Sequence, residues 1–159
     1  MRVSARNICA TLTRQSSARF THMTLTGGSI GFANAAAVGV ALAAPERQTI
    51  ALVGDGSAQY TVQALWTQAR EKLNVVTVIM NNSKYQILRV ECAIQGVRAS
   101  GGACDSLTKL DDPSIDWCKL AEGYGVRGVR TTTCEEFADA FARALDADGP
   151  TLIDAVLEA

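Results

Sequence analysis

Two hydrophobic runs of this chain each end in a small cluster of side chains that carry oxygen. The run TIALV ends in GDG at residues 54–56, and the run VVTVIM ends in NN at residues 81–82. A carboxylate from Asp55 and an amide oxygen from Asn82, with backbone carbonyls, would form a hard oxygen site that suits Mg²⁺ or Ca²⁺ and not zinc. The residue types therefore predict a divalent-cation site, provided that the two clusters meet.

The elements predicted around these clusters bring them together. Residues 49–53 and 75–80 are short and apolar, as buried strands are, and residues 62–73 repeat apolar side chains at helical spacing. Strand, helix and strand with both strands apolar is typical of a parallel βαβ unit. Because the carboxyl ends of neighbouring parallel strands share one edge of a sheet, we expect Asp55 and Asn82 to project into one small volume.

The glycines of the first cluster extend the prediction to a phosphate. We interpret Gly54 and Gly56 as positions whose backbone takes conformations barred to other residues. They would also let a phosphate approach the amides of Gly56 and Ser57. Since Mg²⁺ commonly completes its coordination with substrate phosphates, the combined interpretation is a metal-bridged diphosphate. The alternative is a tight turn followed by an Asn-rich turn; a dinucleotide fingerprint is absent, because GDGSAQ lacks the third glycine of GxGxxG.

The rest of the chain predicts an α/β fold, a doubly wound, mostly parallel sheet with helices on both faces. We expect Trp66 to lie in the core. The further predicted elements, in chain order, are a small-residue helix within 27–44 that is ended by Pro45, a long loop at 96–116, a short helix at 117–124, a strand at 126–130, a helix opened by a capping box of Thr133 and Glu136, and a last strand at 151–157.

Composition excludes several classes of function. The formal net charge of −1 gives no basic field for nucleic acid or a membrane surface, and no apolar run is as long as a membrane span. The one histidine, His22, lies outside the patterned region, which argues against a Ser-His-Asp or Cys-His site. The five cysteines are odd in number and show no CxxC spacing. This argues against a disulfide framework or a zinc site and favours a reducing compartment.

The first 23 residues differ from the rest of the chain. They hold four arginines and no aspartate or glutamate. This composition fits an organellar transit peptide, and equally a disordered or fragmentary leader. We therefore expect a leader over residues 1–23, one domain over residues 24–159, and a location in the cytoplasm or, if the leader is a transit peptide, in the matrix of a mitochondrion or plastid.

The stretch GDGSAQYTVQALWTQAREKLNVVTVIMNN resembles the signature of thiamine diphosphate-dependent enzymes. Its surroundings are similar to benzoylformate decarboxylase and to the large subunits of acetolactate synthase and related proteins. The segment LTGGSIGFANAAAVGVALAAPERQTIALVGDGSAQY resembles the start of their diphosphate-binding domain, and LAEGYGV and GPTLIDAV resemble its C-terminal part. The resemblance covers roughly residues 24–158 and is specific for the cofactor, much less so for the substrate.

The resemblance implies a site. Its metal ligands would be Asp55, Asn82 and the backbone carbonyl of Lys84, holding Mg²⁺. Ile30 would lie beneath the thiazolium ring of thiamine diphosphate, and the carbonyl of Gly28 would accept a hydrogen bond from the cofactor's amino group. The implied cofactor-binding positions are Gly28, Ile30, Gly54, Gly56, Ser57 and Tyr85, the last adjacent to the site without a defined role.

The resemblance also implies that this chain holds half of a site. In the family, a glutamate on a separate pyrimidine-binding domain activates the cofactor for decarboxylation or ligation of a 2-oxo acid, and this chain has no acidic residue before Glu46. We therefore expect no catalytic residue here, little or no activity of the chain alone, a pyrimidine-binding domain from another chain or a missing part of the same protein, and an oligomer.

Three interpretations stay open at this point. The chain is a fragment of a full-length decarboxylase or carboligase, the diphosphate-binding subunit of a split decarboxylase, or a non-catalytic binding or interaction module. A plain nucleotide-binding α/β domain would instead prefer ATP or NAD to thiamine diphosphate. The substrate is not determined by these residues.

Overall fold

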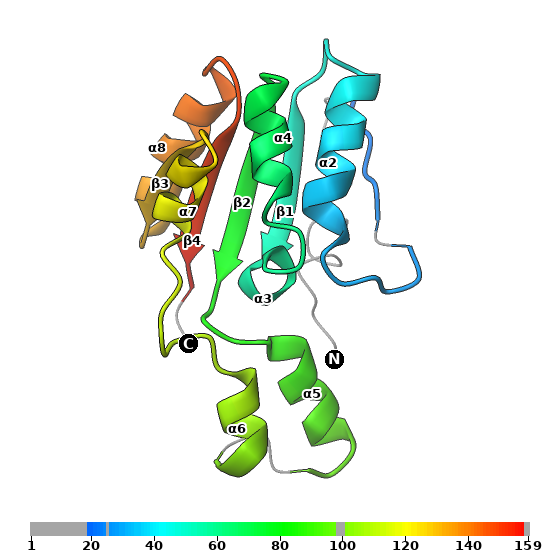
Figure 1. Ribbon diagram of the computed structural model, residues 1–159, viewed down its shortest axis with the longest axis vertical. Coiled ribbons are helices and arrows are strands. Elements are labelled where there is room, and N and C mark those ends of the chain that lie inside the picture. Colours follow the sequence, from blue (N-terminus) through cyan, green and yellow to red (C-terminus); the bar gives the residue numbers. More distant parts are fainter. Residues whose placement is uncertain (1–18, 25, 98–100, 158–159) are drawn as a thin grey trace.

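The computed structural model describes residues 19–24, 26–97 and 101–157. Its centre is a parallel sheet of four strands in the order β1-β2-β4-β3 (Figure 1). The strands are β1 (Thr49–Gly54), β2 (Val75–Asn81), β3 (Arg127–Thr131) and β4 (Thr151–Val156). The parallel α/β fold predicted from the sequence is confirmed.

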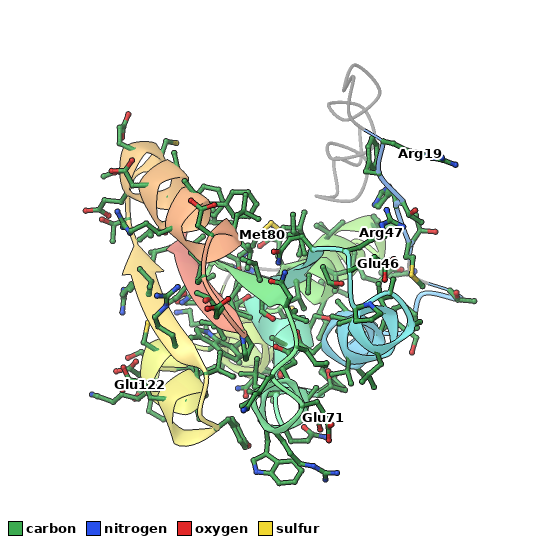
Figure 2. The ribbon with its side chains drawn as sticks, turned by 90° about the horizontal axis from the view of Figure 1, so that it is seen from above. Arg19, Glu46, Arg47, Glu71, Met80 and Glu122 are labelled. Carbon is green, nitrogen blue, oxygen red and sulfur yellow. The ribbon has the colours of Figure 1, made fainter. Side chains whose placement is uncertain are left out.

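Helices cover both faces of the sheet, as Figure 2 shows from above. On one face, α2 (Phe32–Ala43), α4 (Ala64–Arg70) and α7 (Trp117–Gly123) pack against β1, β2 and β4. On the other, α8 (Cys134–Leu145) packs against β2, β3 and β4. Because α8 does not reach β1, Ile50 and Leu52 on that side of the edge strand are about 45% and 42% exposed.

The central strand β2 is buried over both faces because apolar β-branched residues dominate it. Val75 and Ile79 face α2, α4 and α7, whereas Val76 and Val78 face α8. Met80 lies on the α8 side of the same strand (Figure 2). Because side chains alternate along β2, its packing also fixes which way the last side chains of the strand point at the edge of the sheet.

Two further helices lie beyond the carboxyl ends of the strands (Figure 1). They are α5 (Gln86–Ile94) and α6 (Gly102–Thr108), and they contact one another. The prediction of a long loop at 96–116 is therefore wrong in part, because α6 forms within it. No helix was expected at α5, and no residue of α5 is buried.

One expectation about packing is also wrong. Trp66 lies on the outside of α4, about half exposed, with the Arg70 guanidinium 5.3 Å from its ring, while Gln68 is buried. The buried face of α2 is formed by Asn34, Ala37 and Ala41. Leu65 and Leu73 of the same predicted stripe as Trp66 are buried, with Val62 and Ala69 packed against the core, so the helical spacing identified the inward face of α4 and only Trp66 was misplaced.

The helix predicted from the capping box begins as expected. The hydroxyl of Thr133 accepts a hydrogen bond from the Glu136 N–H at 3.2 Å. The Glu136 carboxylate accepts from the backbone N–H of Thr132 instead of Thr133.

The leader expected over residues 1–23 lies largely outside the described residues. Within the described ranges, no helix is long and apolar enough to cross a membrane.

Candidate functional site

Asp55 and Asn82 leave the sheet side by side. Strands β1 and β2 are neighbours and parallel, with Gly54 in register with Met80. Asp55 begins α3 (Asp55–Ala58) directly after β1, and Asn82 follows the last residue of β2. In Figure 1 both strands point toward the space between α3 and the segment that leads into α5. The two clusters that carry the sequence prediction therefore meet at one edge of the sheet.

Asp55 is a buried carboxylate with one free oxygen. The side chain is 3% exposed, and its Oδ1 accepts a hydrogen bond from the Gly56 N–H at 2.9 Å. Burial raises the pKa of Asp55, and the backbone N–H groups of Gly56, Ser83 and Lys84 oppose this rise. Oδ2 is buried and has no hydrogen-bond partner among the described residues. A buried, unpartnered carboxylate oxygen is costly unless a cation occupies the place beside it, so this atom fits a metal site.

The backbone after β2 forms a tight turn next to Asp55. Ser83 has a left-handed backbone, with φ of 55°, and the Asn82 Oδ1 accepts from the Lys84 N–H at 3.2 Å. The carbonyl of Lys84 accepts from the Gln86 N–H at 2.9 Å, which leaves a second lone pair for another partner. The loop therefore presents an amide oxygen and a carbonyl oxygen within three residues.

The end of α6 and the residues after it hold this loop through backbone hydrogen bonds. The Tyr85 N–H donates to the Thr108 carbonyl and the Leu110 N–H donates to the Ser83 carbonyl, each at 2.8 Å. Lys84 and Lys109 form an antiparallel bridge between these bonds. Sequence reasoning missed this support, because residues 108–110 lay inside the expected loop and carry no motif.

Asn81 and Asn82 have different surroundings. The Asn81 amide is buried, its Nδ2 donates to the Asp154 Oδ1 at 2.9 Å, and its Oδ1 accepts from the Ser83 N–H at 3.1 Å. Both ends of that amide are used inside the fold, whereas the Asn82 amide uses only its Oδ1, which accepts from the Lys84 N–H. Burial raises the pKa of Asp154, and the hydrogen bond from Asn81 opposes this rise.

Sequence reasoning also failed to identify Asp154. It is buried in β4 next to β2. The signal that could have found it is a single aspartate inside the apolar strand TLIDAV, since such a residue needs a partner.

The glycine-rich turn before α2 is fastened to α3. The Gly31 N–H donates to the Ser57 Oγ at 2.9 Å, and the Thr61 hydroxyl donates to the Gly31 carbonyl at 2.6 Å. Gly31 has φ of 83°, and a Cβ there would overlap the Tyr60 side chain. These contacts hold the turn that contains Gly28 and Ile30 beside the residues that follow the GDG segment. Ile30 is about 37% exposed, so its side chain remains open to a ligand.

Gly54 and Gly56 do not take glycine-only conformations. Gly54 is extended, with φ of −71°, and neither residue has a positive φ, so that expectation is wrong. Gly56 is required for a different reason, because a Cβ on it would overlap the ring of Tyr85. Burial, followed by the nearby Tyr60 and Asp55, raises the pKa of Tyr85. The phenol ring thus lies against the GDG backbone, close to the carboxylate.

A groove runs from this region along the edge of the sheet. It has a volume of about 480 Å³, and its lining includes Gly54, Ser57, Met80 and Phe32. Ligand access to the GDG turn is therefore open on the β1 side. No cluster of three or more acidic, histidine or cysteine side chains exists among the described residues, so any metal here would depend on mixed carboxylate, amide and carbonyl oxygens.

Comparison with known proteins identifies the architecture. Residues 5–155 match the family model of the thiamine pyrophosphate enzyme C-terminal TPP binding domain. The chain belongs to this family. Thiamine pyrophosphate is thiamine diphosphate, so the expected cofactor class is confirmed, and Mg²⁺ is the ion that the family typically uses with it. The matched range begins within the segment that composition sets apart as a leader.

Relatives with this domain are larger enzymes. The chain is 48% identical over 160 residues to the "Putative acetolactate synthase large subunit IlvX" of Mycobacterium tuberculosis, covering 98% of this chain and 31% of the relative. It is 41% identical to a benzoylformate decarboxylase of Pseudomonas aeruginosa, covering 80% of this chain and 23% of the enzyme. The resemblance stated from the sequence is thereby confirmed.

A solved structure gives the same result. The thiamine diphosphate-dependent 4-hydroxybenzoylformate decarboxylase of Rhodococcus jostii RHA1 superposes with a TM-score of 0.71 at 47% identity, covering 79% of this chain and 22% of that enzyme. The chain therefore spans between about a fifth and a third of the proteins it matches.

Proposed function

We propose that this chain binds Mg²⁺ and the diphosphate end of thiamine diphosphate, and that it supplies this half-site to a 2-oxo-acid decarboxylase or carboligase. The observation that carries the proposal is the buried Asp55 Oδ2, which lacks a partner among the described residues and lies next to the Asn82–Lys84 backbone. Membership of the family supports the identity of the cofactor.

The metal would be held by three oxygen atoms of this chain. Asp55 supplies the only charged ligand, Asn82 an amide oxygen, and Lys84 its backbone carbonyl. One carboxylate leaves a net positive charge on the ion, which favours an anionic diphosphate as the remaining partner. Asn81 and Asp154 do not take part directly; they fix the end of β2 so that Asn82 is presented in one orientation.

The remaining contacts would position the organic part of the cofactor. The backbone N–H of Ser57 would bind the diphosphate, with Tyr85 beside it, whereas the Gly56 N–H donates to the Asp55 carboxylate. Gly28 and Ile30, held against α3 through Gly31, would contact the amino group and the thiazolium ring. When bound, the cofactor supplies an electron sink for loss of CO₂ from a 2-oxo acid. These residues bind and orient it, and the activating glutamate comes from a pyrimidine-binding domain outside this sequence.

A binding titration tests the metal site. Thiamine diphosphate is titrated into the chain with Mg²⁺ and with a chelator, and heat or intrinsic fluorescence is followed. We expect Mg²⁺-dependent binding that Asp55→Asn abolishes. Asp154→Asn is the matched control, because it neutralises a similarly buried carboxylate but keeps an oxygen for Asn81; it should retain binding. Equal binding by Asp55→Asn and the unmodified chain would refute the site.

An activity test addresses the enzymatic role. In a chimera, this chain replaces the C-terminal domain of the Pseudomonas aeruginosa benzoylformate decarboxylase, which is 41% identical over the matched residues. Mg²⁺-dependent release of CO₂ from a 2-oxo acid supports a catalytic half-site. Cofactor binding by the folded chimera without CO₂ release supports a non-catalytic binding module instead.

A further inference from the structure

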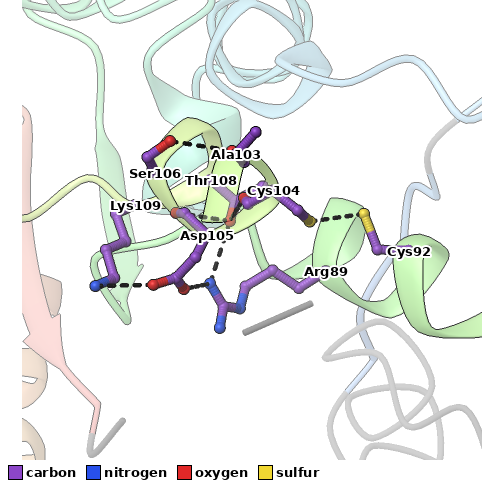
Figure 3. Close-up of polar contacts among 8 residues, drawn as sticks. All are labelled: Arg89, Cys92, Ala103, Cys104, Asp105, Ser106, Thr108 and Lys109. Atoms are coloured by element: carbon purple, nitrogen blue, oxygen red, sulfur yellow. Dashed lines mark hydrogen bonds and ion pairs between the residues drawn. The ribbon is translucent and has the colours of Figure 1, made fainter. Parts of the chain in front are cut away.

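Two cysteines face each other across the α5–α6 helical pair. The sulfur of Cys92 on α5 lies 2.8 Å from the sulfur of Cys104 on α6 (Figure 3). Both thiols are free and both side chains are half-buried. Of the other two cysteines among the described residues, Cys118 is half-buried on α7 and Cys134 is exposed at the start of α8. Among these four described cysteines, Cys92 and Cys104 are the one pair within hydrogen-bond distance.

An ion-pair network holds the two helices together beside the thiols. The Arg89 guanidinium contacts the Asp105 carboxylate at 2.6 Å and the Thr108 hydroxyl at 3.2 Å, and the Lys109 ammonium reaches the same carboxylate at 3.1 Å (Figure 3). Arg89 and Lys109 lower the pKa of Asp105, so this carboxylate stays charged. Arg89 precedes Cys92 by three residues, which puts both on one face of α5. The network thus aligns the sulfur atoms before any covalent bond forms.

We propose that Cys92 and Cys104 form a reversible intramolecular disulfide by exchange with a small-molecule disulfide such as oxidised glutathione. The S–S bond of a disulfide is about 2.05 Å, so the sulfurs need to approach by only about 0.8 Å from their observed separation. Such a movement is within the reach of side-chain torsions and leaves the two helices in place.

The exchange balances in two steps. The thiolate of one cysteine attacks a sulfur of oxidised glutathione, forming a mixed disulfide and releasing one glutathione thiolate, which takes up a proton. The second cysteine, as a thiolate, attacks the protein sulfur of the mixed disulfide, and the second glutathione leaves and is protonated. Two protein thiols are oxidised, and one glutathione disulfide is reduced to two thiols. The hydrogen bond with Cys92, with burial, raises the pKa of Cys104.

The cross-link would close the unit that supports the cofactor loop. Helix α5 begins directly after Tyr85, and α6 ends at Thr108, whose carbonyl accepts the Tyr85 N–H. The disulfide proposal depends on these two helices and not on the cofactor proposal, because its test measures sulfur chemistry alone.

Peptide mapping tests the proposal directly. The full chain is incubated with oxidised glutathione, remaining thiols are alkylated, and the protein is digested with trypsin without reduction. Arg89, Arg98 and Lys109 place Cys92 in the peptide 90–98 and Cys104 in the peptide 99–109, each with one cysteine. We expect to recover these two peptides joined, and we expect them to separate on reduction. The yield of this pair should exceed that of every other cysteine pairing, while Cys134 carries glutathione.

Variants and unfolding provide the controls. Cys92→Ser should abolish the joined peptide and leave glutathione on Cys104, whereas Cys134→Ser should not change the yield of the joined peptide. In concentrated urea the preference for this pair should be lost. The proposal is overturned if Cys92 and Cys104 stay free or each carry glutathione while Cys134 reacts. It is also overturned if the unfolded chain forms the same pair equally well, since sequence proximity would then explain the pairing.

Discussion

Replacing Asn81 and Asn82 by alanine, one at a time, should separate a structural role from a binding role in two adjacent residues of the same type. Asn81→Ala removes the donor to the buried Asp154 carboxylate and the acceptor of the Ser83 N–H. A hydrogen bond to a charged group contributes about 1.5–3 kcal/mol, and a neutral one about 0.5–1.5 kcal/mol. We therefore expect Asn81→Ala to lower the free energy of unfolding by roughly 2–4 kcal/mol.

Asn82→Ala should behave differently. Asn82 is half-buried, and among the described residues its side chain makes one hydrogen bond, accepting from the Lys84 N–H at 3.2 Å. Its loss should lower the free energy of unfolding by less than about 1 kcal/mol. It should, however, remove most of the Mg²⁺-dependent binding of thiamine diphosphate, because the amide oxygen is a proposed ligand.

Urea unfolding and cofactor titration of both variants form the assay. Midpoints with a common slope give the stability difference. For a chain of this size, the thermal midpoint of Asn81→Ala should fall by roughly 4–16 °C. The penalty should shrink as the pH falls through the pKa of Asp154, because the Asn81 hydrogen bond stabilises the charged carboxylate. The reasoning is refuted if Asn82→Ala destabilises as much as Asn81→Ala, or if it binds the cofactor like the unmodified chain.

Three further predictions follow from single contacts. Gly56→Ala places a Cβ against the Tyr85 ring and should lower the free energy of unfolding by about 1–3 kcal/mol in urea titrations; adding Tyr85→Ala should restore most of the loss. Mg²⁺-dependent cofactor affinity, measured by titration across pH, should fall as the pH drops through the raised pKa of Asp55, since only the ionised carboxylate binds the ion. This fall should come at a higher pH than for an ordinary aspartate, whose pKa is about 3.9. An affinity that stays level down to that ordinary value would contradict the burial of Asp55. Thr133→Ala removes the cap of α8 and should cost about 1 kcal/mol in the same unfolding assay, whereas Thr132→Ser, which keeps a hydroxyl for Glu136, should cost less.

The candidate site combines buried hydrogen bonds with groups that remain open. At the carboxyl edge of the sheet, Asn81, Asp154 and Ser83 lock the end of β2 through buried hydrogen bonds. Beside it, the Asp55 Oδ2 has no partner among the described residues and the Ile30 side chain is exposed. Such a division suits the proposed half-site, because the buried bonds fix the proposed ligand positions without covering them.

Local pattern in the sequence determined the parallel βαβ unit and the place of its polar ends. Apolar β-branched strands separated by a helical stripe pair side by side, and this brings Asp55 next to Asn82 without any knowledge of distant contacts. Only the tertiary structure decided which asparagine is used inside the fold, that residues 108–110 support the loop, that Tyr85 lies on Gly56, and that Cys92 meets Cys104. Each of these depends on partners many residues away, Asp154 being 73 positions from Asn81. The spacing of residues within one element carries no information about such partners, because they are selected by how whole helices and strands pack together.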